Sequence, residues 1–366
     1  MLRCICPKAD LVPPFKIAVP IGTIPCSSLR GRPGADMKRR EFITLLGGAV
    51  VAWPLAARAQ QPKKIPRLCF LTFDPGTLLS RSPRFDAFFE GLRDLGYVNG
   101  QTIAIDYLSA EGVGERFPAL AAECVRRKAD IIAVSTTPAA QAAKKATRTI
   151  PIVMIALGDP VGTGLVDNLA HPGGNVTGMS LMVPELAAKR LGLLKQAVPE
   201  MSRVLVLSYL ADPIAPLQVT ALQEAARSLS VTLVVQDIRS ADDLEAAFDA
   251  GLKQSVEGLI TTAESIFVVQ RTRVSELAAR HKLPAIYPFS IQVTDGGGLM
   301  AYDVIIPDLH RSAALYVDRI LKGAKPSELP VQQPSSVRFV INLKTAKALG
   351  LKLPSALLSI ADELIE

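Results

Sequence analysis

The chain has 366 residues, 49% hydrophobic and 20% charged, so it can bury a sizeable core, and its length predicts about two domains. The formal net charge of +7 is concentrated in residues 1–59, which hold nine of the 41 basic side chains and three of the 34 acidic ones. Residues 60–366 are nearly neutral, with 32 basic and 31 acidic side chains, which argues against a nucleic-acid partner.

A complete export signal begins at Met37. The sequence MKRREFITLLGGAVVAWPLAARAQQ places three basic residues before an apolar run, Ile43–Leu55, that is too short to span a bilayer. An Ala-Arg-Ala triplet precedes Gln60 and gives the small-x-small pattern that a signal peptidase recognises. The sequence therefore predicts a signal peptide over residues 37–59.

The same segment also bears on the export route. Arg39 and Arg40 followed by Glu-Phe-Ile resemble the twin-arginine signal, and an ordinary Sec signal with a chance arginine pair is the alternative. Residues 1–36 precede this signal and show no periodicity, so we expect a non-native or disordered extension there. No later segment is long and apolar enough to span a membrane, so we expect a soluble mature protein.

Two of the five cysteines, Cys69 and Cys124, lie in the mature chain, whereas Cys4, Cys6 and Cys26 precede the signal. Cys69 falls in a predicted strand and Cys124 on a predicted helix. Free cysteine packs well in protein cores, so we expect two small buried thiols rather than a disulfide bond.

In the mature chain, short apolar runs alternate with amphipathic stretches, which is typical of a parallel α/β sheet. The first half contains expected strands at 67–73, 102–108, 130–134, 150–156 and 176–180, and expected helices at 84–95, 116–127 and 139–147. The pattern then restarts, with helices at 184–198, 215–229, 241–253 and 267–281 and strands at 203–208, 232–237, 258–262 and 285–287. The remaining elements are a strand at 298–302, a helix at 308–321, a proline-bounded connection at 325–334, a strand at 337–342 and a helix at 344–349. We expect an α/β protein of two doubly wound lobes.

Seven segments, in this order, resemble the substrate-binding proteins of ABC transporters, a broad periplasmic family that includes tryptophan- and aromatic-amino-acid-binding members. They are GLRDLGYVNGQTIAIDY (91–107), FPALAAECVRRKADII (117–132), GDPVGTGLVDNLAHPGGNVTG (158–178), ELAAKRLGLLKQAVP (185–199), ELAARHKLPAIY (276–287), YVDRILKGAKPSELPVQQP (316–334) and FVINLKTAKALGL (339–351). The resemblance covers nearly the whole mature chain.

This resemblance implies a type I periplasmic-binding-protein fold, in which a hinge joins two lobes around an interlobe cleft. Hinge crossings are expected near Ser180, Pro288 and Val331. The expected N-terminal lobe comprises residues 64–180 plus 289–330, and the expected C-terminal lobe residues 181–288 plus 331–366.

The resemblance also implies a function. We expect the periplasmic solute-binding component of an ABC importer, which captures a small polar ligand, an amino acid or a small carboxylate, by hinge closure. Its partners would be this ligand and an inner-membrane ABC permease with its ATPase. We expect no enzyme activity, no cofactor, no nucleic-acid partner and a monomeric state. An exported ligand-sensing receptor of the same fold, not coupled to transport, is the alternative.

Candidate ligand-binding residues of the first half follow the ends of strands, because ligands of such sheets bind outside the carboxyl ends of the strands. Ser135, Thr136 and Thr137 end a strand and begin a helix, where hydroxyls and free amides suit a carboxylate. Simple N-capping by these side chains is the alternative. Thr72 and Asp74 close the first strand and are candidates for the pocket wall.

A second loop, Gly158-Asp159-Pro160, follows another predicted strand. Asp159 would either hold a ligand ammonium group or cap a short helix after Pro160. Gly158, Gly162 and Gly164 also form a G-x-x-x-G-x-G run, as in some dinucleotide sites. The run comes late in its lobe and Asp159-Pro160 interrupts it, so we do not expect a dinucleotide site.

In the second half, the candidates are Tyr209, Asp212, Glu264, Tyr287 and Tyr302, each near the end of a predicted strand. An aromatic side chain in this position packs at a rim as often as it contacts a ligand. The loops around these residues depart from the pattern of the family, so the ligand class is not carried over from it.

Metal binding and hydrolase chemistry find no support in the sequence. The three histidines, His171, His281 and His310, lack the spacing of metal ligands, and we expect His281 and His310 to face solvent. No G-x-S-x-G motif is present. We therefore expect neither a metal site nor a catalytic residue.

Overall fold

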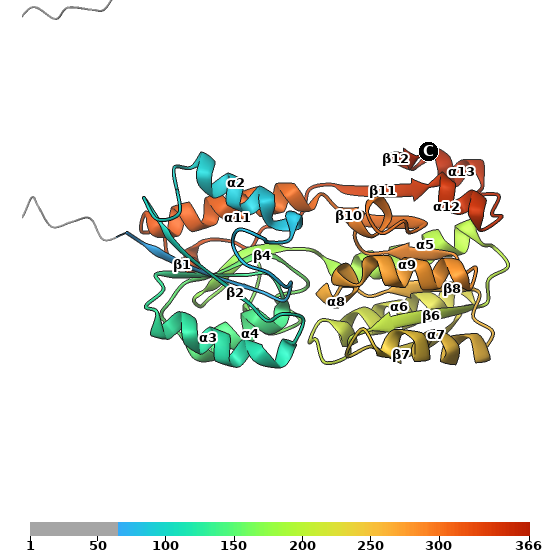
Figure 1. Cartoon of the computed structure of the whole chain (residues 1–366), viewed down its shortest axis with the longest axis horizontal. Helices are drawn as coiled ribbons and strands as arrows, with labels where there is room; N and C mark the ends of the chain where they lie inside the picture. Colours follow the sequence, from blue (N-terminus) through green and yellow to red (C-terminus); the bar gives the residue numbers. More distant parts are fainter. Residues whose placement is uncertain (1–64) are drawn as a thin grey trace, which may run out of the picture. The chain divides into compact units, whose positions relative to one another are not determined.

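The computed structural model describes residues 65–366 (Figure 1). The extension predicted over residues 1–36, the signal peptide predicted over residues 37–59, and Cys4, Cys6 and Cys26 lie outside the described residues. Within the described part of the chain, no helix has the length and apolar character needed to cross a membrane.

The described residues build two sheets, each with helices packed on both faces (Figure 1). The first sheet has the strand order β2-β1-β3-β4-β5 and is entirely parallel. The second has the order β12-β11-β10-β9-β8-β6-β7, in which β10 and β11 are antiparallel. Its part β7-β6-β8-β9-β10 repeats the order of the first sheet. This duplication confirms the prediction of two doubly wound α/β lobes.

The strands of the first sheet are β1 (Arg67–Thr72), β2 (Ala104–Ser109), β3 (Ile131–Val134), β4 (Ile152–Leu157) and β5 (Val176–Ser180). Those of the second are β6 (Arg203–Ser208), β7 (Thr232–Asp237), β8 (Gly258–Thr261), β9 (Ala285–Tyr287), β10 (Met300–Val304), β11 (Val337–Asn342) and β12 (Glu363–Ile365). The helices are α2 (Asp86–Asp94), α3 (Phe117–Arg126), α4 (Thr137–Ala146), α5 (Val183–Ala197), α6 (Ala215–Leu229), α7 (Asp243–Lys253), α8 (Ser265–Val269), α9 (Arg271–Arg280), α10 (Ile291–Thr294), α11 (Ile306–Leu321), α12 (Leu343–Ala348) and α13 (Ser355–Ser359).

Most of these bounds lie within two residues of the predicted ones. The helix expected over residues 267–281 is instead two helices, α8 and α9, which meet at Gln270. Three short elements, α10, α13 and β12, were not predicted. Each spans five residues or fewer, which is too short to show a recognisable apolar period.

Strand β1 shows how the sequence builds a sheet that is covered on both faces. Leu68 and Phe70 pack with the side chains of α2 and α11, and Cys69 and Leu71 pack with those of α3 and α4. All four residues are wholly buried. A strand buried on both faces is expected to be continuously apolar, as this one is.

Cys69 and Cys124 form a disulfide bond, so the expectation of two free thiols is wrong. Cys69 lies on the face of β1 that α3 covers, and the Cα atoms of the two cysteines are 5.7 Å apart. This separation is typical of disulfides. The sequence places the cysteines 55 residues apart and does not show that their elements pack together.

The predicted hinge crossing near Pro288 is wrong. Strand β10 pairs with β9 and β11 in the second sheet, and α11, which follows it, packs against α2 and β4 of the first lobe. The chain therefore crosses at Ile305. The error arose because the sequence of a strand does not reveal which sheet it joins.

The other two crossings lie close to the predicted positions. Strand β5 ends at Ser180, and α5 of the second lobe begins at Val183. Near the third crossing, the backbone N–H groups of Val331 and Gln332 still donate to carbonyls of the first lobe, so the chain crosses after Gln332. We call residues 65–180 and 306–332 the first lobe, and residues 183–304 and 333–366 the second lobe.

Candidate functional site

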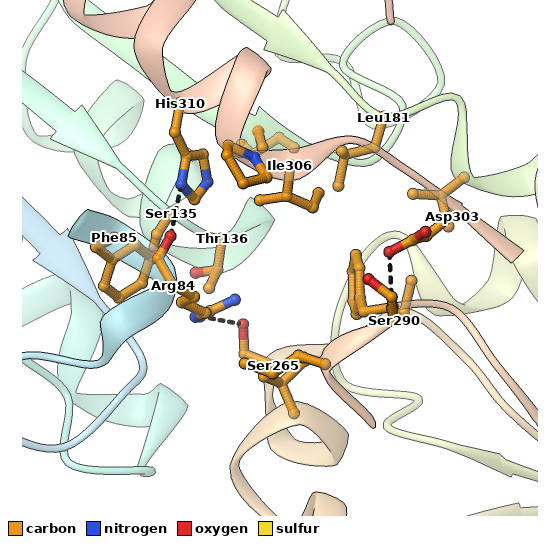
Figure 2. A pocket seen from close by; sticks show the side chains of 18 of the residues that line it. Arg84, Phe85, Ser135, Thr136, Leu181, Ser265, Ser290, Asp303, Ile306 and His310 are labelled. Atoms are coloured by element: carbon orange, nitrogen blue, oxygen red, sulfur yellow. Dashed lines mark hydrogen bonds between the residues drawn. The ribbon is translucent and has the colours of Figure 1, made fainter. Parts of the chain in front are cut away.

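A cavity of about 470 Å³ lies between the two lobes (Figure 2). The first lobe lines it with the start of α2, the start of α4, the end of β4 and the start of α11. The second lobe contributes the loops after β6, β8 and β9 and residues of β10, β11 and β12. Most of these segments follow the carboxyl ends of parallel strands, where doubly wound sheets bind ligands.

The turn between β3 and α4 brings three predicted residues, Ser135, Thr136 and Thr137, to the wall of the cavity. Thr136 is the N-cap of α4, and its Oγ1 accepts a hydrogen bond from Ala139 N at 3.3 Å. The Ser135 hydroxyl is buried and has no hydrogen-bond partner among residues 65–366. A free hydroxyl beside a helix N-terminus provides donors for an anionic group. Thr136 thus caps the helix, while Ser135 is available to a ligand.

Arg84 connects the two lobes across the cavity (Figure 2). Its Nη2 donates a hydrogen bond to Ser265 Oγ, at the start of α8 in the second lobe, at 3.2 Å. Its Nε donates to Asp74 Oδ2 at 2.8 Å, and Nη2 also contacts Asp74 Oδ1. Asp74, predicted to line the pocket, is buried behind the wall. It orients Arg84 and offsets its charge.

His310 lines the cavity from α11 and is 3% exposed, so the expectation that it faces solvent is wrong. Its Nδ1 lies 2.8 Å from the carbonyl oxygen of Arg84. Because a carbonyl oxygen can only accept, Nδ1 carries the hydrogen, and Nε2 is left as an acceptor. Burial, aided by the Arg84 charge, lowers its pKa to about 3. The residues Ala313, Ala314 and Val317 continue the same buried face, and this helical spacing could have located His310.

We expect His310 to weaken the protein in acid. The folded-state pKa lies below that of the unfolded chain, so the stability gained from a neutral His310 is present above about pH 6.5 and is lost as the pH falls towards 3. As the pH is lowered from 6.5 to 4, wild type should therefore lose stability relative to His310→Asn, so its free energy of unfolding minus that of the variant should decrease steadily. Urea denaturation at several pH values measures this difference. A difference that does not change with pH would contradict the prediction.

Glu264 lies at the second-lobe wall and is 2% exposed. Gln218 Nε2 donates to its Oε1 at 2.7 Å, and its Oε2 contacts Thr262 Oγ1. Thr262 Oγ1 also donates a hydrogen bond to the carbonyl oxygen of Leu207, at 3.1 Å. This bond uses the single hydroxyl proton of Thr262, which then has none left to donate to Glu264. Both contacts are satisfied when Glu264 is protonated and donates to Thr262.

Asp212 is the second buried acid of this wall. Burial, aided by the charge of Asp212, raises the pKa of Glu264 to about 8. Burial raises the pKa of Asp212 to about 7, although a hydrogen bond from Ile214 N opposes this shift. A ligand ammonium group would favour the ionised form of either carboxyl.

The remaining predicted residues of the first lobe divide between cavity and surroundings. Gly158 lines the cavity, and a Cβ atom there would lie 2.5 Å from Ile214 of the second lobe, so only glycine permits this approach. Asp159 and Pro160 lie outside the lining. Asp159 Oδ1 accepts from the N–H groups of Val161 and Gly162, so it has the capping role that was its alternative, although the segment that it caps is a turn and not a helix. Thr72 is wholly buried beneath Asp74.

Three predicted tyrosines do not reach this cavity. Tyr209 borders a much smaller adjoining space. Tyr287 is wholly buried in the core of the second lobe, and the ring of Tyr302 packs against Phe339. Successive side chains of a strand point to opposite faces, and Asp303, not Tyr302, occupies the cavity face of β10.

Several cavity residues were not predicted from the sequence: Arg84, Ser265, Ser290, Asp303, His310 and Arg338. Figure 2 shows that Ser290 and Asp303 lie at the opposite side of the cavity from Ser135 and Thr136. Leu181 and Ile306 lie along the wall between them. The cavity therefore has polar groups at two ends and an apolar stretch between them.

Residues 80–365 match the family described as ABC transporter substrate binding protein. The chain belongs to this family. The match spans both lobes and every cavity residue named above, and it confirms the resemblance seen in the sequence. The protein is accordingly a substrate-binding component of an ABC transporter, and its family is one of binding proteins, not of enzymes.

Three relatives extend this comparison. A tyrosine-binding protein from Clostridioides difficile is 30% identical over 269 residues, 74% of this chain and 77% of that protein. The structure of an ABC domain in complex with L-Trp from Streptococcus pneumoniae has a TM-score of 0.73 at 26% identity and covers 82% of this chain and 99% of that one. The ligand-free, open structure of a substrate binding protein with adhesive properties from Clostridium difficile has a TM-score of 0.57 at 26% identity, with the same coverage. The type I periplasmic-binding fold is thus confirmed.

Proposed function

We propose that this protein is the exported solute-binding component of an ABC importer and that it captures a small polar ligand, an amino acid or a small carboxylate, between its lobes. This proposal rests on the interlobe cavity, whose polar side chains come from both lobes. The ligand would then be passed to an inner-membrane permease with its ATPase.

The chemistry of the wall supports a zwitterionic amino acid. Ser135 and the start of α4 provide donors for a carboxylate in the first lobe. Asp212 and Glu264 provide buried carboxyls for an ammonium group in the second lobe. Two relatives, named for L-Trp and for tyrosine, bind ligands of this class.

We further propose that the ligand closes the two lobes about the hinge. A ligand that contacts both lobes stabilises the arrangement in which they are close. In the present structure the two lobes already contact each other through Arg84 and Ser265. The TM-score is 0.73 with the L-Trp complex and 0.57 with the open, ligand-free relative, although both are 26% identical to this chain.

Export to the periplasm is supported by two independent features. The sequence predicts a signal peptide over residues 37–59. The mature chain contains the Cys69–Cys124 disulfide, a bond that persists in oxidising compartments such as the periplasm. Detection of the cleaved chain in a periplasmic fraction tests this part of the proposal, and an uncleaved chain in the cytosol would contradict it.

The ligand is best sought by thermal-shift screening with the twenty amino acids and a set of small carboxylates. A ligand should raise the melting temperature, because it binds the folded state alone. Small-angle scattering with the strongest hit should show compaction. A tightly bound ligand that leaves the radius of gyration unchanged would rule out hinge closure.

We expect Ser135→Ala to weaken binding of the best screened ligand by about 1–3 kcal/mol, because a ligand group would lose its partner inside the cavity. The matched control is Asp159→Ala, which removes a turn cap outside the cavity and should leave the affinity unchanged. Calorimetric titration measures both. Equal affinities for wild type and Ser135→Ala would place the carboxylate site elsewhere.

A further inference from the structure

The second-lobe end of the cavity contains two buried polar atoms that lack a hydrogen-bond partner among residues 65–366. Asp303 is 2% exposed, and its Oδ2 accepts a hydrogen bond from Ser290 N at 2.7 Å, but its Oδ1 has no partner. The Arg338 Nε atom also has none, because it lies 3.8 Å from Asp303 Oδ1, beyond hydrogen-bond distance. Buried polar atoms without partners are rare in folded proteins and costly.

The backbone fixes these two residues next to each other. Asp303 on β10 is directly opposite Arg338 on β11, so their side chains share one face of the sheet, and both line the cavity. Arg338 Nη2 donates to Ser290 Oγ, and its Nη1 lies 3.5 Å from Glu363 Oε2. The guanidinium is thus held by its terminal nitrogens, and only Nε remains without an acceptor.

The charges around this site are already balanced. Asp303 and Glu363 are opposed by Arg338 and by Arg190, a buried residue whose charge acts on Asp303. A further cation would lie close to two guanidinium groups, and a further anion would face Asp303. Burying an uncompensated charge is expensive, so the site favours a neutral group.

The ligand group at this site must be neutral and must pair with both Asp303 Oδ1 and Arg338 Nε, and a hydroxyl group does both. It is neutral, and it can donate its proton to Asp303 Oδ1 while its oxygen accepts from Arg338 Nε. An ammonium group could satisfy only Asp303, because it has no acceptor. We propose that Asp303 and Arg338 bind a hydroxyl group at the end of the ligand far from Ser135. The ligand would then be a small acid or amino acid that carries a hydroxyl beyond an apolar body, a statement that rests on the proposed function.

The apolar stretch of the cavity fits the apolar body proposed for the ligand between its two polar ends. Leu181 and Ile306 lie between Ser135 on one side and Asp303 on the other (Figure 2). A site that satisfies a ligand hydroxyl rejects the analogue without it, because the polar groups of the protein are then left unpaired. The preference for the hydroxyl should therefore be large.

The test compares matched probes by calorimetric titration on the full chain: L-tyrosine with L-phenylalanine, and 4-hydroxyphenylacetate with phenylacetate. We expect the hydroxylated member of at least one pair to bind about 10- to 100-fold more tightly. In Asp303→Asn the amide oxygen can still accept from Ser290, but its NH₂ then faces the hydroxyl together with Arg338 Nε, so the hydroxyl proton has no acceptor. The preference should fall to within about 3-fold.

The control is Thr294→Val, which alters another cavity residue whose hydroxyl bonds only to Asp295 among the described residues and should keep the preference. If Asp303→Asn fails to fold, Arg338→Met tests the donor instead, with the same expected loss. If wild type binds both members of each pair with equal affinity, as expected when a water molecule hydrogen-bonds to Asp303 Oδ1 and Arg338 Nε, the hydroxyl assignment is overturned. The proposed function then still stands. Failure of all four probes to bind also overturns it, while the amino-acid and carboxylate screen judges the proposed function separately.

Discussion

Replacing both Cys69 and Cys124 by alanine should lower the free energy of unfolding by about 4 kcal/mol, the value expected for a disulfide that closes a loop of this length. The bond joins β1 to α3 across 55 residues, so its removal frees a long segment of the unfolded chain. Both cysteines are wholly buried, and alanine leaves no unpaired polar atom in their place. Urea denaturation of the two proteins at one pH measures the difference.

The control for this experiment is wild-type protein reduced with dithiothreitol, which has the same side chains without the bond. It should lose a similar amount of stability. Thiol titration of the unreduced, denatured protein should show that neither Cys69 nor Cys124 reacts. Two reactive thiols from these positions, or a loss below about 1 kcal/mol, would contradict the prediction.

The elements of the fold were predictable because their signals are local. Strands β6 and β7 and helix α6 have the predicted bounds, since continuous apolar runs and helical periodicity mark them without reference to the rest of the chain. The partner of an element is not a local property. This explains why β10 was assigned to the wrong lobe and why the bond between Cys69 and Cys124 was not foreseen.

The candidate site was predictable only where it follows directly from a strand end. Ser135, Gly158, Asp212 and Glu264 were found in this way and line the cavity. Residues contributed from elsewhere were missed, as with Arg84, which approaches from a turn before α2 and depends on Asp74 for its orientation. Strand polarity locates the edge of a sheet, whereas the opposite wall of a cleft depends on how the lobes meet.

Raising the pH from 6.5 to 9 should lower the free energy of unfolding by about 3 kcal/mol, because two buried carboxyls must ionise. Burial raises the pKa of Glu264 from 4.5 to about 8 and that of Asp212 from 3.8 to about 7. An acid whose pKa is raised by folding stabilises the folded state fully below its unfolded pKa and loses this contribution as the pH rises to the folded value. His310 is neutral in the folded state over this range and only half protonated at pH 6.5 in the unfolded chain, so it offsets this loss by about 0.4 kcal/mol at most.

Glu264→Gln should remove most of this pH dependence. The glutamine amide can donate to Thr262 and its oxygen can accept from Gln218, so the variant should match wild type near pH 6.5 and exceed it at pH 9 by about 2 kcal/mol. Urea denaturation at pH 6.5, 7.5 and 9 measures both proteins. The control is Glu257→Gln, because hydrogen bonds from Ser202 lower the pKa of that acid and it titrates well below this range. A wild-type stability that stays level to pH 9, or falls equally in Glu264→Gln, would show that Glu264 is already ionised in the folded protein.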